Sequence, residues 1–147
     1  MSGCPQQKGL CYALDIPLIT AGTLEIMAYA VKDEGAGLIC PLVDARRMEV
    51  FTAIYDKSLA VIKKPCAMIL HESSFSELLS SNTMIFCGNG SKKLQAILFN
   101  NHAIFSTHTA TASDMCHLSY RYYRENKFAD TAYTEPLYIK EFFSPER

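Results

Sequence analysis

The pattern of the stretch LICPLVDARRMEVFTAIYD, residues 38–56, is compatible with essentially one local structure. It opens with the almost unbroken apolar run Leu38–Val43, as expected for a strand covered on both faces, and closes with Glu49–Tyr55, which is rich in β-branched and aromatic residues. A short polar segment joins the two runs. Because a tight reversal connects antiparallel neighbours, whereas a parallel return needs a long crossover, the stretch predicts a β-hairpin in the middle of a sheet.

The segments before the hairpin predict mainly helix. Residues 8–14 indicate the last turns of a helix that follows a turn-like Ser2–Pro5, and Pro17–Ile19 is a short extended piece. A second helix, capped by Thr20 or Thr23, has an apolar face. That face is expected to consist of Ile26, Met27, Ala30 and Val31.

The segments after the hairpin alternate between strand and helix. A third strand, Leu59–Lys64, ends at Pro65, and a Ser74-x-x-Glu77 capping box opens a short helix. Three elements follow, namely a strand at 84–87, a helix capped by Ser91 with Leu94, Ile97 and Leu98 inward, and a strand at 103–106. The last helix carries the apolar stripe Met115, Leu118, Ser119, Tyr122 and Tyr123, and an extended tail at 132–143 comes after it.

This order of elements predicts an α/β fold. Three antiparallel strands followed by two strands reached through helical crossovers give a mixed five-stranded sheet with helices on both faces. That is the topology of a ribonuclease H-like lobe, the unit duplicated in the actin-like ATPase superfamily. We expect residues 38–147 to form this lobe.

Composition indicates an ordinary globular domain. The 147 residues are 49% hydrophobic and 20% charged, with a net charge of −1, which argues against a protein built mainly to hold nucleic acid. Several of the six cysteines sit inside apolar runs and no export signal precedes them, so we expect buried free thiols, Cys40 and Cys87 in particular. They form no C-x-x-C pair, so neither a zinc ribbon nor a thioredoxin-type redox centre is indicated. No apolar run approaches the ~20 residues that cross a bilayer and residues 1–7 are not a signal peptide, so a cytoplasmic location without membrane contact is expected.

Two loops are candidate nucleotide contacts. Gly88-Asn89-Gly90 sits at a strand-to-helix junction and could offer N–H groups to an anion, although no Walker pattern follows it. In catalytic actin-like ATPases, which the topology resembles, the equivalent hairpin holds phosphate with glycine N–H groups and has an Asp near the metal, which would be Asp44 here. Residues 45–47 of this turn carry side chains, and these allow a close approach to phosphate less well than glycine does. The structural alternatives are a glycine-assisted turn for the first loop, and for the second a turn fixed by Asp44 with Arg46 presented toward a cleft or partner.

Catalytic and metal sites are not predicted. The four histidines, His71, His102, His108 and His117, form no His-x-x-x-His or His-Glu-x-x-His pair. Cys116 and His117 are neighbours on a helix and point in different directions, so they make a poor nucleophile and base. The tyrosines at 122 and 123 favour core packing over base stacking.

Several segments resemble the TsaB (YeaZ) family, the actin-like, non-catalytic partner in tRNA threonylcarbamoyladenosine modification that was formerly described as a glycoprotease. They occur in the family's order and cover most of the chain. They are KGLCYALDIPLI at 8–19 with Thr23-Leu24, Asp44-Ala-Arg46 with Glu49-Val-Phe51, Gly88-Asn-Gly90, and EPLYIK at 135–140. Relative to the family, most of an N-terminal lobe is absent, so residues 1–37 are expected to be a remnant of that lobe and its connecting helix.

The resemblance implies a non-enzymatic role. The chain would dock on and activate the catalytic paralogue TsaD as a heterodimer, and would meet the ATPase subunit TsaE and tRNA indirectly. The chain itself would bind no cofactor tightly. ATP or ADP with Mg²⁺ would be bound at an interface of the complex. Asp44, Gly88, Asn89 and Gly90 would be the nucleotide contacts, and Arg46 and Glu49 would face the cleft or partner. A peptidase or nucleotide hydrolase, and a vestigial truncated family member, are the alternatives, and exposed apolar surface predicts self-association into a homodimer.

Overall fold

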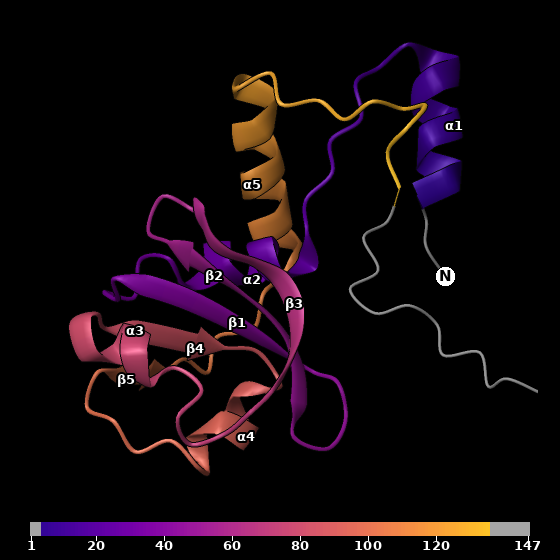
Figure 1. Cartoon of the computed structure of the whole chain (residues 1–147). Coiled ribbons are helices and arrows are strands. Elements are labelled where there is room, and N and C mark those ends of the chain that lie inside the picture. The colour runs from indigo at the N-terminus through magenta and orange to yellow at the C-terminus, as the bar shows by residue number, and fades with distance from the viewer. Residues whose placement is uncertain (1–3, 136–147) are drawn as a thin grey trace, which may run out of the picture.

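A five-stranded mixed sheet forms the centre of the molecule (Figure 1). The computed structural model describes residues 4–135, with side chains from Gln6 onward. The strand order is β3-β2-β1-β4-β5; β1 pairs antiparallel with β2 and β2 with β3, whereas β1 and β4, and β4 and β5, run parallel. The strands are β1 Leu38–Asp44, β2 Glu49–Asp56, β3 Val61–Ile69, β4 Met84–Cys87 and β5 Ala103–Phe105. The predicted hairpin and ribonuclease H-like topology are confirmed.

The third strand differs from its prediction because it continues through Pro65. Between the pairs Thr52–Cys66 and Ile54–Lys63, β2 advances two residues while β3 advances three, so β3 is bulged there. Proline lacks an N–H to donate and is tolerated at a bulge on an edge strand, which is where β3 lies. Pro65 therefore bends the strand without ending it.

Helices cover both faces of the sheet, as predicted (Figure 1). Side chains alternate along β1, so that Leu38, Cys40 and Leu42 enter one core while Ile39 enters the other. The helices α3 Ser76–Ser81 and α4 Ser91–Gln95 close the first core, and α2 Thr23–Val31 and α5 Ala112–Arg124 close the second. Helix α2 therefore packs with the lobe, although it falls in the range 1–37.

The helix faces differ in part from the expected stripes. In α2 the buried residues are Leu24, Ala28 and Val31. In α5 Leu118 is fully buried, whereas Met115 and Tyr123, toward the two ends of the helix, are 48% and 55% exposed, and the carboxyl-terminal end of α5 extends beyond the sheet (Figure 1). The apolar stripe of α5 thus covers the sheet only along its middle.

Three predicted helix caps are wrong. The N-cap positions of α2, α3 and α4 are held by Gly22, Phe75 and Gly90, and none makes a side-chain cap hydrogen bond. The Ser74 hydroxyl instead accepts a hydrogen bond from the His71 N–H at 2.7 Å, and the Ser91 hydroxyl donates to the Gly88 carbonyl at 2.7 Å. Both hydroxyls form hydrogen bonds with the loops that precede their helices, so neither hydroxyl caps the first turn of its helix.

The first helix, α1 Cys4–Leu14, stands apart from the sheet (Figure 1). It begins at Cys4, so Cys4 and Pro5 are helical and the turn predicted there is wrong; proline is well tolerated in the first turn. The Lys8 ammonium donates to the Thr134 carbonyl at 2.6 Å, and Leu18 forms an isolated antiparallel bridge with Ala129. The predicted tail at 132–143 lies mostly outside the described residues, beyond Glu135.

The expected free thiols are present among the described cysteines. Cys40 and Cys87 are buried and Cys116 is exposed, and all five cysteines with described side chains are free. Over residues 4–135 no helix is long and apolar enough to span a membrane.

Candidate functional site

The loops that follow β1, β4 and β5 meet at one edge of the sheet. These three strands run parallel and adjacent, so their carboxyl ends lie together, which is where ligands bind in open α/β sheets. A cavity of about 790 Å³ opens there. Its lining comes from α2 (Thr23, Met27), β1 (Val43), the β4–α4 region (Cys87, Gly88, Asn89, Ser91, Lys92, Gln95), the last residue of β5 (Phe105) and residues 106–110 after it.

The β1–β2 turn and the β4–α4 loop are tied together by what we call the clasp, made of Asp44, Asn89 and Lys93. The Asp44 backbone N–H donates to the Asn89 side-chain oxygen at 2.9 Å. The Asp44 carboxylate accepts from the Lys93 ammonium at 2.7 Å and from the Arg46 N–H at 2.8 Å. These two bonds lower the pKa of Asp44. The clasp brings the predicted residues Asp44 and Asn89 into contact.

Gly88 and Gly90 lie against β1 for packing reasons. Gly88 has φ +92°, and a Cβ there would stand 2.5 Å from the Leu42 carbonyl oxygen. A Cβ at Gly90 would meet Val50 at 3.0 Å, and the Gly90 N–H already donates to the Leu42 carbonyl at 2.9 Å. The Gly90 N–H is thus turned into the protein rather than toward the cavity, which matches the glycine-assisted turn that the sequence left open.

The two other predicted residues lie at the hairpin turn. Arg46 is exposed with φ +78°, and Arg47 beside it has φ +47°. Glu49 is half-buried at the start of β2. Arg46 therefore projects from the molecule next to the clasp.

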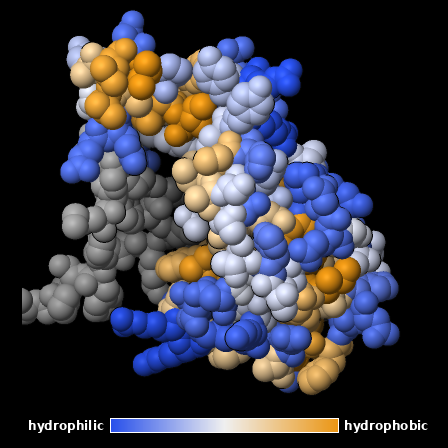
Figure 2. Space-filling model, turned by 180° about the vertical axis from the view of Figure 1, so that it is seen from behind, coloured by the Kyte–Doolittle hydropathy of each residue, from blue (hydrophilic) through white to orange (hydrophobic). Residues whose placement is uncertain are grey.

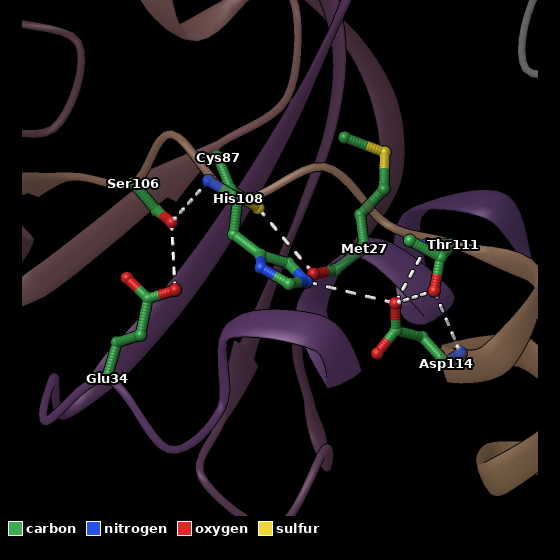
Figure 3. A network of polar contacts seen from close by, with 7 residues as sticks. All are labelled: Met27, Glu34, Cys87, Ser106, His108, Thr111 and Asp114. Carbon is green, nitrogen blue, oxygen red and sulfur yellow. Dashed lines mark hydrogen bonds and ion pairs between the residues drawn. The ribbon is translucent and has the colours of Figure 1, made fainter.

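A polar network on the far side of the cavity was not predicted (Figure 3). The His108 N–H donates to the Ser106 hydroxyl at 3.1 Å, and that hydroxyl donates to the Glu34 carboxylate at 2.9 Å. Figure 3 shows the His108 ring directed toward Asp114, with Nε2 to Oδ2 at 3.8 Å. A capping box with Thr111 at the start of α5 holds Asp114.

The capping box also fixes the charge of the carboxylate that faces His108. Asp114 accepts from the Thr111 hydroxyl at 2.7 Å and from its N–H at 2.8 Å, and these bonds lower the pKa of Asp114. The Thr111-x-x-Asp114 spacing was a readable signal for this cap. The contacts of Ser106 with Glu34, 72 residues away, had no local signal.

Cys87 lies beside this network but is unsuited to nucleophilic chemistry. Burial raises the pKa of its thiol to about 12, so the reactive thiolate is absent near neutral pH. Its sulfur is directed to the Met27 carbonyl at 3.7 Å, and the His108 ring points to Asp114 instead (Figure 3). Cys116 and His117 are both exposed on α5. Across residues 4–135 no group of three or more His, Cys, Asp or Glu could hold a metal ion.

The fold is shared with solved structures, including two that match over more than nine-tenths of this chain. One is an uncharacterized protein with similarity to peptidase YeaZ from Pseudomonas aeruginosa, with TM-score 0.75, 18% identity and 94% of this chain covered. The other is YeaZ from Pseudomonas aeruginosa, with TM-score 0.67, 17% identity and 92% of this chain covered. The chain spans 66% and 65% of their respective lengths. The likeness confirms the ribonuclease H-like, actin-like fold.

A protein-family model matches most of the chain. No curated protein matches the chain. The TsaD family, described as tRNA N6-adenosine threonylcarbamoyltransferase, matches residues 1–135. That match covers well over half of the sequence and, with the YeaZ fold, confirms the resemblance found in the residues. The chain therefore belongs to the TsaD family.

Proposed function

We propose that this chain is a non-catalytic scaffold subunit in tRNA threonylcarbamoyladenosine modification. It docks on the catalytic TsaD paralogue as a heterodimer and activates it, while ATP is hydrolysed elsewhere in the assembly, by TsaE. Membership of the TsaD family supports the tRNA modification setting. The YeaZ fold supports the accessory rather than the catalytic position within it.

The clasp is the observation that carries this proposal. A catalytic actin-like subunit needs a free carboxylate and free backbone N–H groups at this edge of the sheet, for metal and phosphate. Here the Asp44 carboxylate is paired with Lys93, and the Gly90 N–H is bonded to β1. The Asn89 side-chain oxygen is bonded to the Asp44 N–H. The polar groups of these loops serve to hold the loops together.

A resident nucleotide with Mg²⁺ does not fit this edge. A metal would have to displace Lys93 from Asp44, and the turn beside it carries arginine side chains in place of the glycines that let backbone approach phosphate closely. We propose accordingly that ATP or ADP with Mg²⁺ contacts the chain only at an interface of the complex. Gly88 and Asn89 are the residues that would face it.

The test is a titration of the full chain against TsaD from the same source, followed by sedimentation velocity and by threonylcarbamoyl transfer to tRNA. We expect a saturable complex and a transfer rate that rises with the amount of chain added. An Asp44→Ala variant should activate TsaD as well as the wild-type chain. Absence of a complex together with an unchanged rate would refute the scaffold role. ATP or peptide hydrolysis by the chain alone that disappears in Asp44→Ala would establish the hydrolase alternative.

A further inference from the structure

We propose that a basic corner of the lobe, made of Arg46, Arg47 and Lys92, contacts the phosphodiester backbone of RNA directly. Arg46 and Arg47 form the tip of the β1–β2 turn, and Lys92 lies at the start of α4. The clasp joins the two elements, because Lys93 pairs with Asp44 and Asn89 bonds to the same residue. This inference rests on the proposed function, since that function brings a tRNA to the complex.

The backbone of the turn is the first observation. Arg46 and Arg47 are consecutive residues with positive φ, a conformation for which hairpin turns select Asn, Asp or Gly. Arginine with its Cβ is disfavoured there, and glycine at both positions would suit the turn better. Unfavourable backbone kept at an exposed turn points to a use for the side chains it carries.

The charges of the corner are the second observation. Lys93 neutralises Asp44, whereas Arg46, Arg47 and Lys92 make no ion pair among the residues that the structure describes. Arg46 and Arg47 are exposed. In the space-filling view strongly hydrophilic side chains stand out from the lower edge of the lobe, the edge where Figure 1 places the β1–β2 turn and α4 (Figure 2). Uncompensated positive charge is therefore gathered at one edge.

The chemistry of the corner favours phosphate over a protein surface. Guanidinium groups bind phosphate oxygens through two parallel hydrogen bonds and need no apolar surroundings for this. Protein hot spots, by contrast, lie in desolvated apolar pockets. The residues flanking the two arginines are Asp44, Ala45, Met48 and Glu49, of which only Met48 is a large apolar residue, 37% exposed. An acidic protein face is therefore the weaker candidate.

The experiment is a fluorescence-anisotropy titration of a labelled tRNA transcript with the full chain at several salt concentrations. The test variants are Arg46→Gln/Arg47→Gln and Arg46→Gly/Arg47→Gly, the second of which suits the turn and guards against misfolding. The control is Lys57→Gln/Arg124→Gln, which removes the same charge from exposed sites away from this edge. Loss of two phosphate contacts should weaken binding at least about tenfold at low salt and make the slope of log K against log salt about 2 less negative.

Each outcome decides the matter when TsaD binding is measured on the same variants. The proposal is supported if both arginine variants lose tRNA affinity, the control variant keeps it, and TsaD binding is unaffected. Unchanged tRNA affinity in the arginine variants, or no tRNA affinity in the wild-type chain either alone or with TsaD, would overturn it and leave the scaffold role intact. Loss of TsaD binding in the arginine variants would overturn it in favour of an acidic protein partner.

Discussion

Gly88 occupies the tightest position in the candidate site, and Gly88→Ala tests the account given of it. Gly88 combines φ +92° with a close approach to β1, where a Cβ would lie 2.5 Å from the Leu42 carbonyl oxygen. That oxygen belongs to a central strand bonded on both sides, so it cannot move away cheaply. The substitution therefore adds steric overlap to the conformational cost of positive φ.

Both costs can be put into numbers. Positive φ costs a residue with a Cβ about 1–2 kcal/mol. Overpacking of a well-packed site costs about 1–3 kcal/mol more. Gly88→Ala should thus lower the free energy of unfolding by roughly 2–5 kcal/mol, a large share of the roughly 5–15 kcal/mol of a typical domain.

Gly35 provides a matched control in the same chain. It has φ +90°, but a Cβ there would meet no atom within 4 Å. Gly35→Ala should therefore cost only the conformational part, about 1–2 kcal/mol. The gain from a less flexible unfolded chain is the same for both variants and cancels in the comparison.

The assay is urea unfolding followed by circular dichroism on the wild-type chain and both variants, with free energies from linear extrapolation. Gly88→Ala should be the less stable variant by about 1–3 kcal/mol, which is the overpacking part alone. Equal losses in the two variants would refute the reasoning, because they would mean that the contact with β1 contributes nothing. A smaller loss at Gly88 would refute it more strongly.

Three further predictions concern other parts of the fold. Thr111→Val removes the α5 cap and should cost about 1 kcal/mol in urea unfolding. The pKa of Asp114 is lowered in the folded state, so the ionised Asp114 stabilises the fold above its unfolded pKa of about 3.9, and this stabilisation is lost as pH falls through the folded pKa. The variant should therefore lose less stability than the wild type on acidification below about pH 4. Thr52→Val deletes a buried hydroxyl that donates to a β1 carbonyl at 2.9 Å and should cost about 1–3 kcal/mol, whereas a change within the error of unfolding measurements would contradict the role given to this bond. In mass-spectrometric thiol labelling of the native chain Cys116 should react first among the five cysteines with described side chains. Cys40, whose pKa burial raises to about 12, should react only after unfolding, and early labelling of Cys40 would show that the sheet opens.

The centre of the sheet could be predicted because its signals are local. The apolar run before Asp44 and the short polar reversal specify a hairpin wherever they occur, and the order of later elements then admits few topologies. Pro65 was misread because a proline stops a central strand but not a bulged edge strand, and the edge position depends on which strands pair. The caps failed for a related reason, since Ser74 and Ser91 each have a loop partner that competes with the helix.

The candidate site was predicted in part. Asp44 and Asn89 were both singled out, yet the bond between them joins residues 45 positions apart, so the clasp follows only from the parallel pairing of β1 and β4. The network at His108 likewise depends on Glu34 and on the path of the chain after β5. The residue types indicated Asp44 and Asn89 as candidate site residues, but only the topology of the sheet shows that these residues bond to each other.

The bridge between Leu18 and Ala129 has a consequence for how the chain folds. It joins segments separated by 111 residues, and the bond from Lys8 to Thr134 spans 126. During synthesis residues 4–22 leave the ribosome long before Ala129 and Thr134, which anchor them, so α1 has no tertiary contact with these residues while the sheet assembles. Contacts of such long sequence separation form late and slowly. Helix α1 is then synthesised before the sheet and secured after it.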